Sequence, residues 1–137
     1  MEWTFSCPRC GAVVNPSGVV TLVAARGGVR LLLGFHPEPG NYQLFLPPGA
    51  ALRDGEEWSF SCPVCHADLA CADHPNLCEL VQIVGGERRR LLFSRIAGER
   101  ATYVLCDDDD LVERHGDHAD KYDDTVRLTR QRRDGSG

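Results

Sequence analysis

The sequence predicts a mainly β protein in which one unit, a Cys-Pro-x-Cys knuckle followed by a three-stranded meander, occurs twice. Three observations support this prediction. Segments 3–10 and 58–65 are identical at six of eight positions, and an apolar run rich in β-branched residues follows each segment. Gly-Gly then interrupts each run, as is typical of a tight hairpin turn. We therefore expect two repeats, 3–53 and 58–106, related by a pseudo-two-fold axis.

In the first repeat, β-branched and apolar residues favour strands over 19–25 and 29–35, joined by the turn at Gly27-Gly28. Alternating polarity predicts a third strand over 42–46. Three prolines between residues 38 and 53 exclude a helix from that segment.

The second repeat has the same plan, with strands expected over 79–84, 88–94 and 101–106 and a turn at Gly85-Gly86. Its sequence matches the first repeat at an offset of 58, and its three extra residues lie between Cys65 and Leu80. Because a lone three-stranded meander has little core, the two repeats should pack their apolar faces together as a single domain over residues 1–106.

The composition changes after residue 106, since residues 107–137 contain 10 acidic and 6 basic side chains. Four aspartates at 107–110 favour the start of a short helix over roughly 111–123, because carboxylates stabilise a helix N-terminus. The basic end, residues 127–137, is expected to be a flexible tail.

Composition and charge narrow the class of protein. The chain has 137 residues and a net charge of −5, which is unlike a generic nucleic-acid coat protein. It has no run of 18 apolar residues, so no membrane span is predicted. The first residues do not resemble a secretory signal, which predicts a cytoplasmic location. Seven cysteines in that reducing compartment indicate metal ligands or reactive thiols rather than disulfides.

The two knuckles supply four sulfurs, those of Cys7, Cys10, Cys62 and Cys65. A tight turn lets two thiolates converge on one ion, and the proline fixes φ after the first ligand. Four sulfurs match the tetrahedral coordination of Zn²⁺. The simplest arrangement takes two ligands from each repeat, so we expect one structural zinc ion on the pseudo-axis.

Three other cysteine chemistries have to be weighed. The segment from Cys62 to His66 fits the c-type haem pattern, but haem attachment requires export and the first repeat has Gly11 in place of the histidine. A thioredoxin-like dithiol is disfavoured because strand-like sequence follows both motifs. A second metal site at Cys71, His74 and Cys78 is the third alternative; ordinary loop thiols with a surface histidine are the simpler interpretation.

A basic cluster in the second repeat is a candidate for anion or partner binding. The five arginines fall within 13 residues and are Arg88, Arg89, Arg90, Arg95 and Arg100. They could contact RNA or another anion, but charge that protects an edge strand from aggregation is the favoured interpretation.

The motif residues Cys7, Pro8, Cys10, Cys62, Pro63 and Cys65 resemble those of the zinc-ribbon superfamily. More narrowly, they resemble the CpXC-type domains, uncharacterised bacterial proteins with two such motifs. The resemblance implies a small interaction domain that a metal ion stabilises and that acts in transcription, translation or enzyme assembly. It implies no catalytic residues.

The sequence shows no catalytic constellation, so we do not expect an enzyme. The favoured function is a zinc-containing accessory or adaptor protein that docks on a larger protein assembly, with homodimerisation through exposed sheet edges as a further option. The alternative is a nucleic-acid-binding regulatory protein. Thiol redox chemistry and hydrolysis at a second zinc form a third class.

Overall fold

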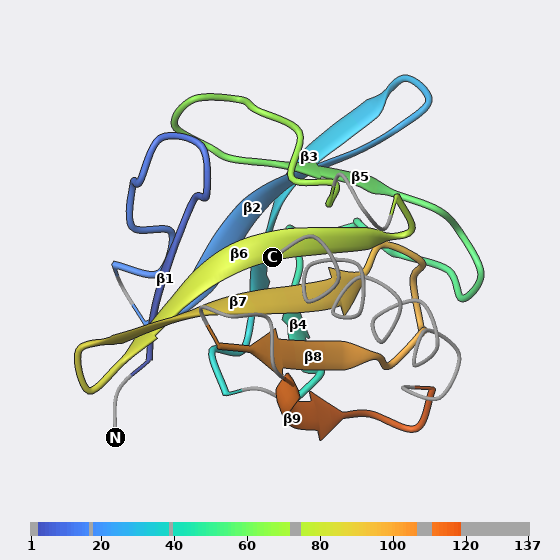
Figure 1. The fold of residues 1–137 in the computed structure, drawn as a ribbon. Coiled ribbons are helices and arrows are strands. Elements are labelled where there is room, and N and C mark those ends of the chain that lie inside the picture. The colour runs from blue at the N-terminus through green and yellow to red at the C-terminus, as the bar shows by residue number, and fades with distance from the viewer. Residues whose placement is uncertain (1–2, 17, 39, 72–74, 107–110, 119–137) are drawn as a thin grey trace.

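Two antiparallel sheets make up the computed structural model, which describes residues 3–16, 18–38, 40–71, 75–106 and 111–118 (Figure 1). The smaller sheet has the strand order β4-β3-β2-β5, with bounds β2 Val20–Arg26, β3 Val29–Phe35, β4 Leu44–Phe45 and β5 Ser59–Ser61. The larger sheet has the order β1-β6-β7-β8-β9, with bounds β1 Thr4–Ser6, β6 Leu77–Val84, β7 Glu87–Ser94, β8 Thr102–Leu105 and β9 Leu111–His115.

The mainly β prediction is confirmed, and both Gly-Gly hairpins form. The β2–β3 hairpin turns at Gly27-Gly28, where Gly27 has a φ of 58°. The β6–β7 hairpin turns at Gly85-Gly86, where both glycines have positive φ. Side chains with a Cβ adopt such angles only at a cost, so glycine suits these positions. The third strand of the first repeat is shorter than the predicted 42–46 and covers only β4.

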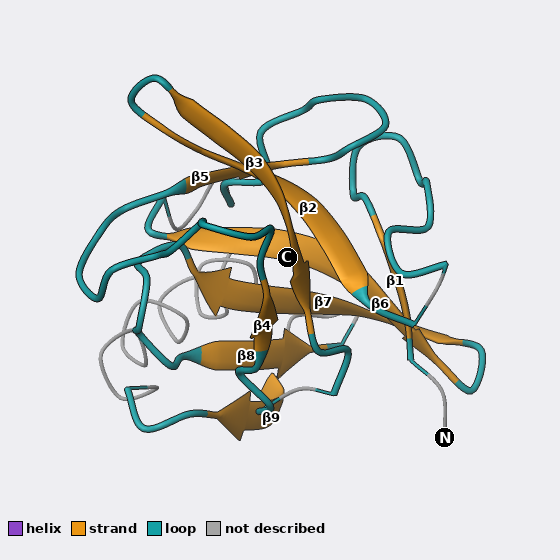
Figure 2. Cartoon of the chain, turned by 180° about the vertical axis from the view of Figure 1, so that it is seen from behind, coloured by secondary structure: helices purple, strands orange, loops and turns teal. Residues whose placement is uncertain are grey.

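The first strand of each repeat lies in the sheet of the other repeat. Strand β1 pairs with β6, placing Phe5 opposite Gln82, and β5 pairs with β2, placing Phe60 opposite Ala24. These registers are equivalent, since Phe5 aligns with Phe60 and Ala24 with Gln82 in the two repeats. Figure 2 shows β2 and β3 crossing over the larger sheet, with β5 along the smaller one. The exchange brings the two knuckles that follow β1 and β5 close together.

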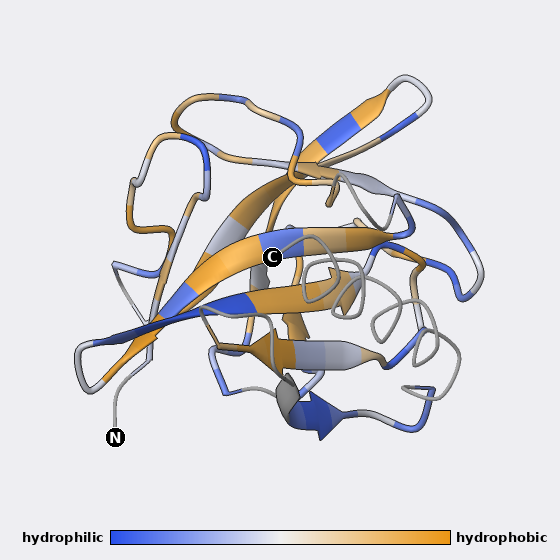
Figure 3. Cartoon of the chain, in the orientation of Figure 1, coloured by the Kyte–Doolittle hydropathy of each residue, from blue (hydrophilic) through white to orange (hydrophobic). Residues whose placement is uncertain are grey.

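The main hydrophobic core lies between the two sheets. It includes Leu22 and Leu33 from the smaller sheet and Leu80, Leu91 and Val104 from the larger one. Neighbouring residues on a strand point to opposite faces. A second buried cluster therefore covers the other face of the larger sheet, and its members are Cys71, Leu77, Leu92, Ala101, Tyr103 and Leu105. Figure 3 shows β7 changing from hydrophilic near the β6–β7 turn to hydrophobic at its far end.

The predicted helix over 111–123 is wrong where the structure describes it. Residues Leu111–His115 form β9, which pairs with β8 and places Arg114 opposite Tyr103. Strand β8 would otherwise present an open edge of unpaired N–H and C=O groups, and pairing with it outweighs the local preference of acidic residues for a helix start. Residues 107–110 and 119–137, including the predicted tail, lie outside the described residues. Within the described ranges, no helix has the length and hydropathy needed to cross a lipid bilayer.

Candidate metal centre

The two knuckles are built by the same backbone hydrogen bonds. The N–H of Gly11 donates to the carbonyl of Cys7, and the N–H of His66 donates to the carbonyl of Cys62, both at 2.9 Å. Gly11 and His66 both have positive φ, of 78° and 63°. A glycine is expected there. In the second knuckle a histidine is held in the same left-handed conformation, which is costly for a residue with a Cβ.

Backbone N–H groups also point at the first sulfur of each knuckle. Arg9 donates to Cys7 Sγ and Val64 donates to Cys62 Sγ, each at 3.3 Å. A further bond runs from the Cys65 N–H to Cys62 Sγ at 3.5 Å. Such donors stabilise the thiolate, which is the form of cysteine that binds a metal. Sequence spacing alone does not reveal these donors.

The four sulfurs converge in a geometry suited to one ion. Cys7 Sγ lies 3.8 Å from Cys65 Sγ, and Cys10 Sγ lies 3.8 Å from Cys62 Sγ. All four sulfurs lie within 4.8 Å of one another. A disulfide would need a separation of about 2.05 Å. A tetrahedral zinc ion with Zn–S bonds of about 2.3 Å places its sulfurs about 3.8 Å apart.

Burial differs between the first and second cysteine of each knuckle. Cys7 and Cys62 are buried, at 1% and 0% exposure, whereas Cys10 and Cys65 are exposed. An ion among the sulfurs would thus have the protein interior on one side and the tips of the knuckles on the other. Protein sulfurs would fill all four positions of a tetrahedral ion here, an arrangement that is typical of a structural site and would leave no open position for substrate.

The thiols of the cluster differ in acidity. Burial opposes ionisation of Cys62, but the N–H groups of Cys65 and Val64 outweigh it and lower the pKa to about 7. For Cys65 the N–H of Ala67 favours the thiolate, yet partial desolvation and the neighbouring cysteine side chains together raise the pKa to about 11. Within the second knuckle the thiolate of Cys62 is therefore favoured over that of Cys65. A divalent cation among them would let all four ionise.

The second predicted site is less well assembled. Cys71 and Cys78 are both buried, but they belong to different hydrophobic clusters. Burial raises the pKa of Cys78 to about 12, and the Cys71 sulfur accepts a hydrogen bond from Arg90 at 3.5 Å. His74 lies outside the described residues. Among the residues that the structure describes, the four-cysteine cluster is the one group of three or more metal-binding side chains.

Two arginines of the basic cluster form ion pairs within the larger sheet. Arg89 forms ion pairs with Glu87 and Glu113, at 3.0 and 3.3 Å. Arg90 pairs with Glu79 at 2.9 Å.

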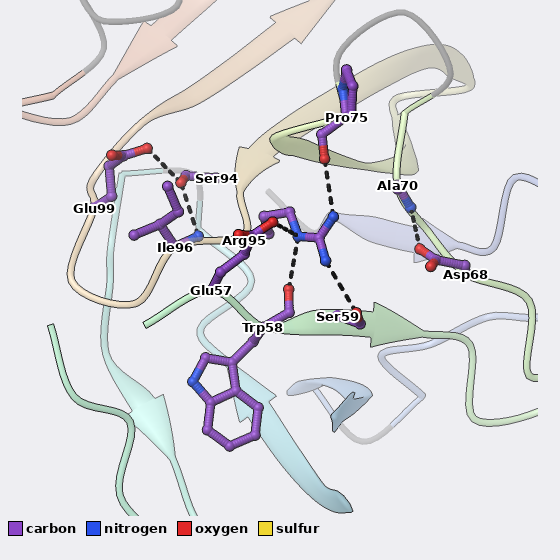
Figure 4. A network of polar contacts seen from close by, with 10 residues as sticks. All are labelled: Glu57, Trp58, Ser59, Asp68, Ala70, Pro75, Ser94, Arg95, Ile96 and Glu99. Carbon is purple, nitrogen blue, oxygen red and sulfur yellow. Dashed lines mark hydrogen bonds and ion pairs between the residues drawn. The ribbon is translucent and has the colours of Figure 1, made fainter. Parts of the chain in front are cut away.

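Arg95 donates to the carbonyls of Trp58 and Pro75 and to Ser59 Oγ, at 3.0, 3.2 and 3.1 Å (Figure 4). Arg100 lies over the ring of Tyr42, 5.7 Å from its centroid, and Arg88 is exposed. Most of this basic cluster thus ties strands and loops together. The favoured interpretation, charge that protects an edge strand, is wrong for residues 88–90, because β7 lies between β6 and β8 inside the larger sheet.

No protein-family model, no curated protein and no solved structure matches this chain. The likeness to zinc ribbons therefore rests on the site itself. The structure brings Cys7, Cys10, Cys62 and Cys65 together as the spacing predicts, in an arrangement that could hold one metal ion.

Proposed function

We propose that the protein binds one structural Zn²⁺ through its four-cysteine cluster and acts as an adaptor that docks on a larger protein assembly. The convergence of four sulfurs from two knuckles supports the zinc part of this proposal. Thiolate ligands favour zinc over harder cations such as Mg²⁺ or Ca²⁺, and an all-sulfur tetrahedral set is typical of structural zinc.

The role of the zinc follows from where its ligands come from. Strands β1 and β5 each contain three residues, and each lies in the sheet of the other repeat. Such short strands contribute few ladder hydrogen bonds. An ion that joins Cys7 and Cys10 to Cys62 and Cys65 locks both exchanged strands at once. The zinc therefore stabilises the contact between the repeats.

Exposed apolar side chains support the docking role. Leu32, Leu44 and Phe45 are 54%, 38% and 42% exposed, and they lie on the edge of the smaller sheet formed by β3 and β4. Phe45 pairs with Gly34, two residues from Leu32, so the side chains of Leu32 and Phe45 share one face of the sheet. A two-residue edge strand beside an apolar face provides both open hydrogen-bonding groups and contact area for a partner.

Zinc quantitation tests the metal part of the proposal. Protein purified without added metal should contain one zinc ion per chain. Cys62→Ser should lose it, and Cys106→Ser, which changes a half-buried cysteine outside the cluster, should keep it. Folded wild-type protein without zinc would contradict the assignment.

Affinity capture from lysate of the source organism tests the adaptor part. The wild-type protein should recover a partner in stoichiometric amount, and the double variant Leu32→Ser, Phe45→Ser should not. The variant must retain its zinc, so that loss of the partner reports on the surface and not on folding. Recovery of no stoichiometric partner by the wild-type protein would refute docking and leave the zinc site standing.

A further inference from the structure

A cavity of about 250 Å³ lies between the two sheets, and none of the four clustered cysteines lines it. Its walls come from the core and from two connections, residues 36–38 and 40–42 after β3 and residues 95–101 between β7 and β8. These connections occupy corresponding places in the two repeats but differ in sequence. Exposed residues at their tips, among them Glu38 and Gly98, lie along the cavity, so it can be reached from solvent.

Aromatic rings form one wall of the cavity. Phe35, Phe60 and Phe93 make a triangle with ring centroids 5.6 to 5.7 Å apart, in edge-on and tilted contacts. Phe35 and Phe93 come from corresponding positions of the two hairpins, and both are only half-buried although they pack against the core. Rings in this arrangement offer faces and edges to a further aromatic ring.

The cavity also contains a hydrogen-bond donor without a partner. Trp58 lines the cavity and is 4% exposed. Its indole Nε1 is buried and makes no hydrogen bond to any residue that the structure describes. Buried indole N–H groups normally have an acceptor. The backbone of Trp58 is fixed by two bonds to Arg95, one from each residue to the carbonyl of the other, both at 3.0 Å. Figure 4 shows the indole pointing away from the Arg95 guanidinium, with its nitrogen on the side where Ile96 lies.

Charge and size limit what the cavity can hold. Three carboxylate residues line it, Asp54, Glu38 and Glu99, against Arg95 and Arg100. Both arginines already contact protein groups. This balance disfavours an anion. A dry cavity of about 150 Å³ holds benzene, so one of this volume has room for a fused two-ring molecule.

We propose that this cavity binds a small, neutral, planar aromatic molecule whose single hydrogen-bond acceptor pairs with Trp58 Nε1. This aromatic molecule stacks against the triangle of Phe35, Phe60 and Phe93, and it supplies the hydrogen-bond acceptor that the indole lacks. None of the four clustered cysteines lines this site, and of the docking side chains Leu32, Leu44 and Phe45 only Leu44 does.

Quinoline and naphthalene form a matched pair of probes, because they have nearly the same shape and only quinoline has a nitrogen acceptor. Each is titrated into the zinc-loaded protein while ¹H–¹⁵N spectra record the two tryptophan indole resonances, which Trp58→Phe and Trp3→Phe assign. We expect saturable binding of quinoline with a shift of the Trp58 indole signal. Quinoline should bind roughly three- to ten-fold more tightly than naphthalene, the range expected for one neutral hydrogen bond.

The comparison within the wild-type protein needs no variant, so a folding defect cannot obscure it. In Trp58→Phe the preference for quinoline should disappear, and in Trp3→Phe it should remain. Ala97→Phe, which adds a ring to the wall of the cavity, should weaken both probes. Equal affinity of the two probes, a shift confined to the Trp3 signal, or no saturable binding of either probe would each overturn the proposal.

Discussion

Replacing Cys62 with serine should release the metal ion and separate the two knuckles. Cys62 is fully buried, and its sulfur accepts hydrogen bonds from the N–H groups of Val64 and Cys65. The same sulfur lies 3.8 Å from Cys10 Sγ. A serine hydroxyl stays neutral at pH 7 and is a poor zinc ligand. Three sulfurs then remain, which weakens the binding of the ion.

The expected loss of stability follows from the loop that the metal closes. Residues 11–61, 51 in all, separate Cys10 from Cys62. The chain-entropy relation for a cross-link of that length gives about 4 kcal/mol. For a domain of this size, each kcal/mol corresponds to roughly 3–4 °C in Tm, so Tm should fall by about 12 °C or more. Structural zinc in small domains contributes apparent energies of about 10–16 kcal/mol, which makes this figure a lower bound.

Differential scanning calorimetry together with zinc quantitation measures both effects in the same samples. Cys106→Ser serves as the control and should keep one zinc ion and a Tm within about 2 °C of the wild type, as expected for a substitution away from the core. If Cys62→Ser retains a full equivalent of zinc, or unfolds at the wild-type temperature, then the two knuckles do not share an ion.

Three further predictions concern single residues. His66→Gly should stabilise the zinc-loaded protein by up to about 1 kcal/mol in urea unfolding, because His66 has a φ of 63° and glycine adopts that angle without strain; a loss of stability would show that the histidine makes a compensating contact. Gln82→Met should raise the free energy of unfolding by about 1 kcal/mol or more, since both amide atoms of Gln82 are buried without a partner in the described part of the chain; an unchanged urea midpoint would argue against that cost. Burial raises the pKa of Cys78 from 9.0 to about 12, so the unfolded thiol ionises first and stability should fall from about pH 9 toward pH 12, by up to about 1.4 kcal/mol per pH unit. Urea midpoints at pH 8 and pH 10 should differ less in Cys78→Ala than in the wild type, and equal pH dependence would exclude Cys78 as the cause.

Local sequence predicted most of the strands because each of them has a local signal. Strand β3 begins and ends where the β-branched run and the Gly-Gly turn indicate. The cysteine spacing likewise anticipates the cluster, because a Cys-x-x-Cys turn fixes two sulfurs at short range. The 42–46 strand shortens to β4, where prolines follow closely in the chain.

The remaining features depend on contacts between distant segments. Nothing within residues 4–6 specifies β6 as the partner of β1, since either sheet offers an antiparallel edge. The segment 111–115 forms a strand because β8 is available to pair with it, and the acidic residues before it gave a misleading helix signal. The cavity could not be predicted from the sequence either. The sequence shows that the two connecting turns differ, but it does not show the space that they leave beside Trp58.

The exchange of first strands makes the two repeats interdependent. Cutting the chain within residues 54–57 would leave each fragment without the strand that completes its sheet and with only one pair of sulfurs. Either fragment alone would lack one strand of its sheet, and the two fragments together would contain all nine described strands and all four clustered cysteines. Each half of the chain is therefore completed by a strand from the other, and residues 54–57 connect the two halves.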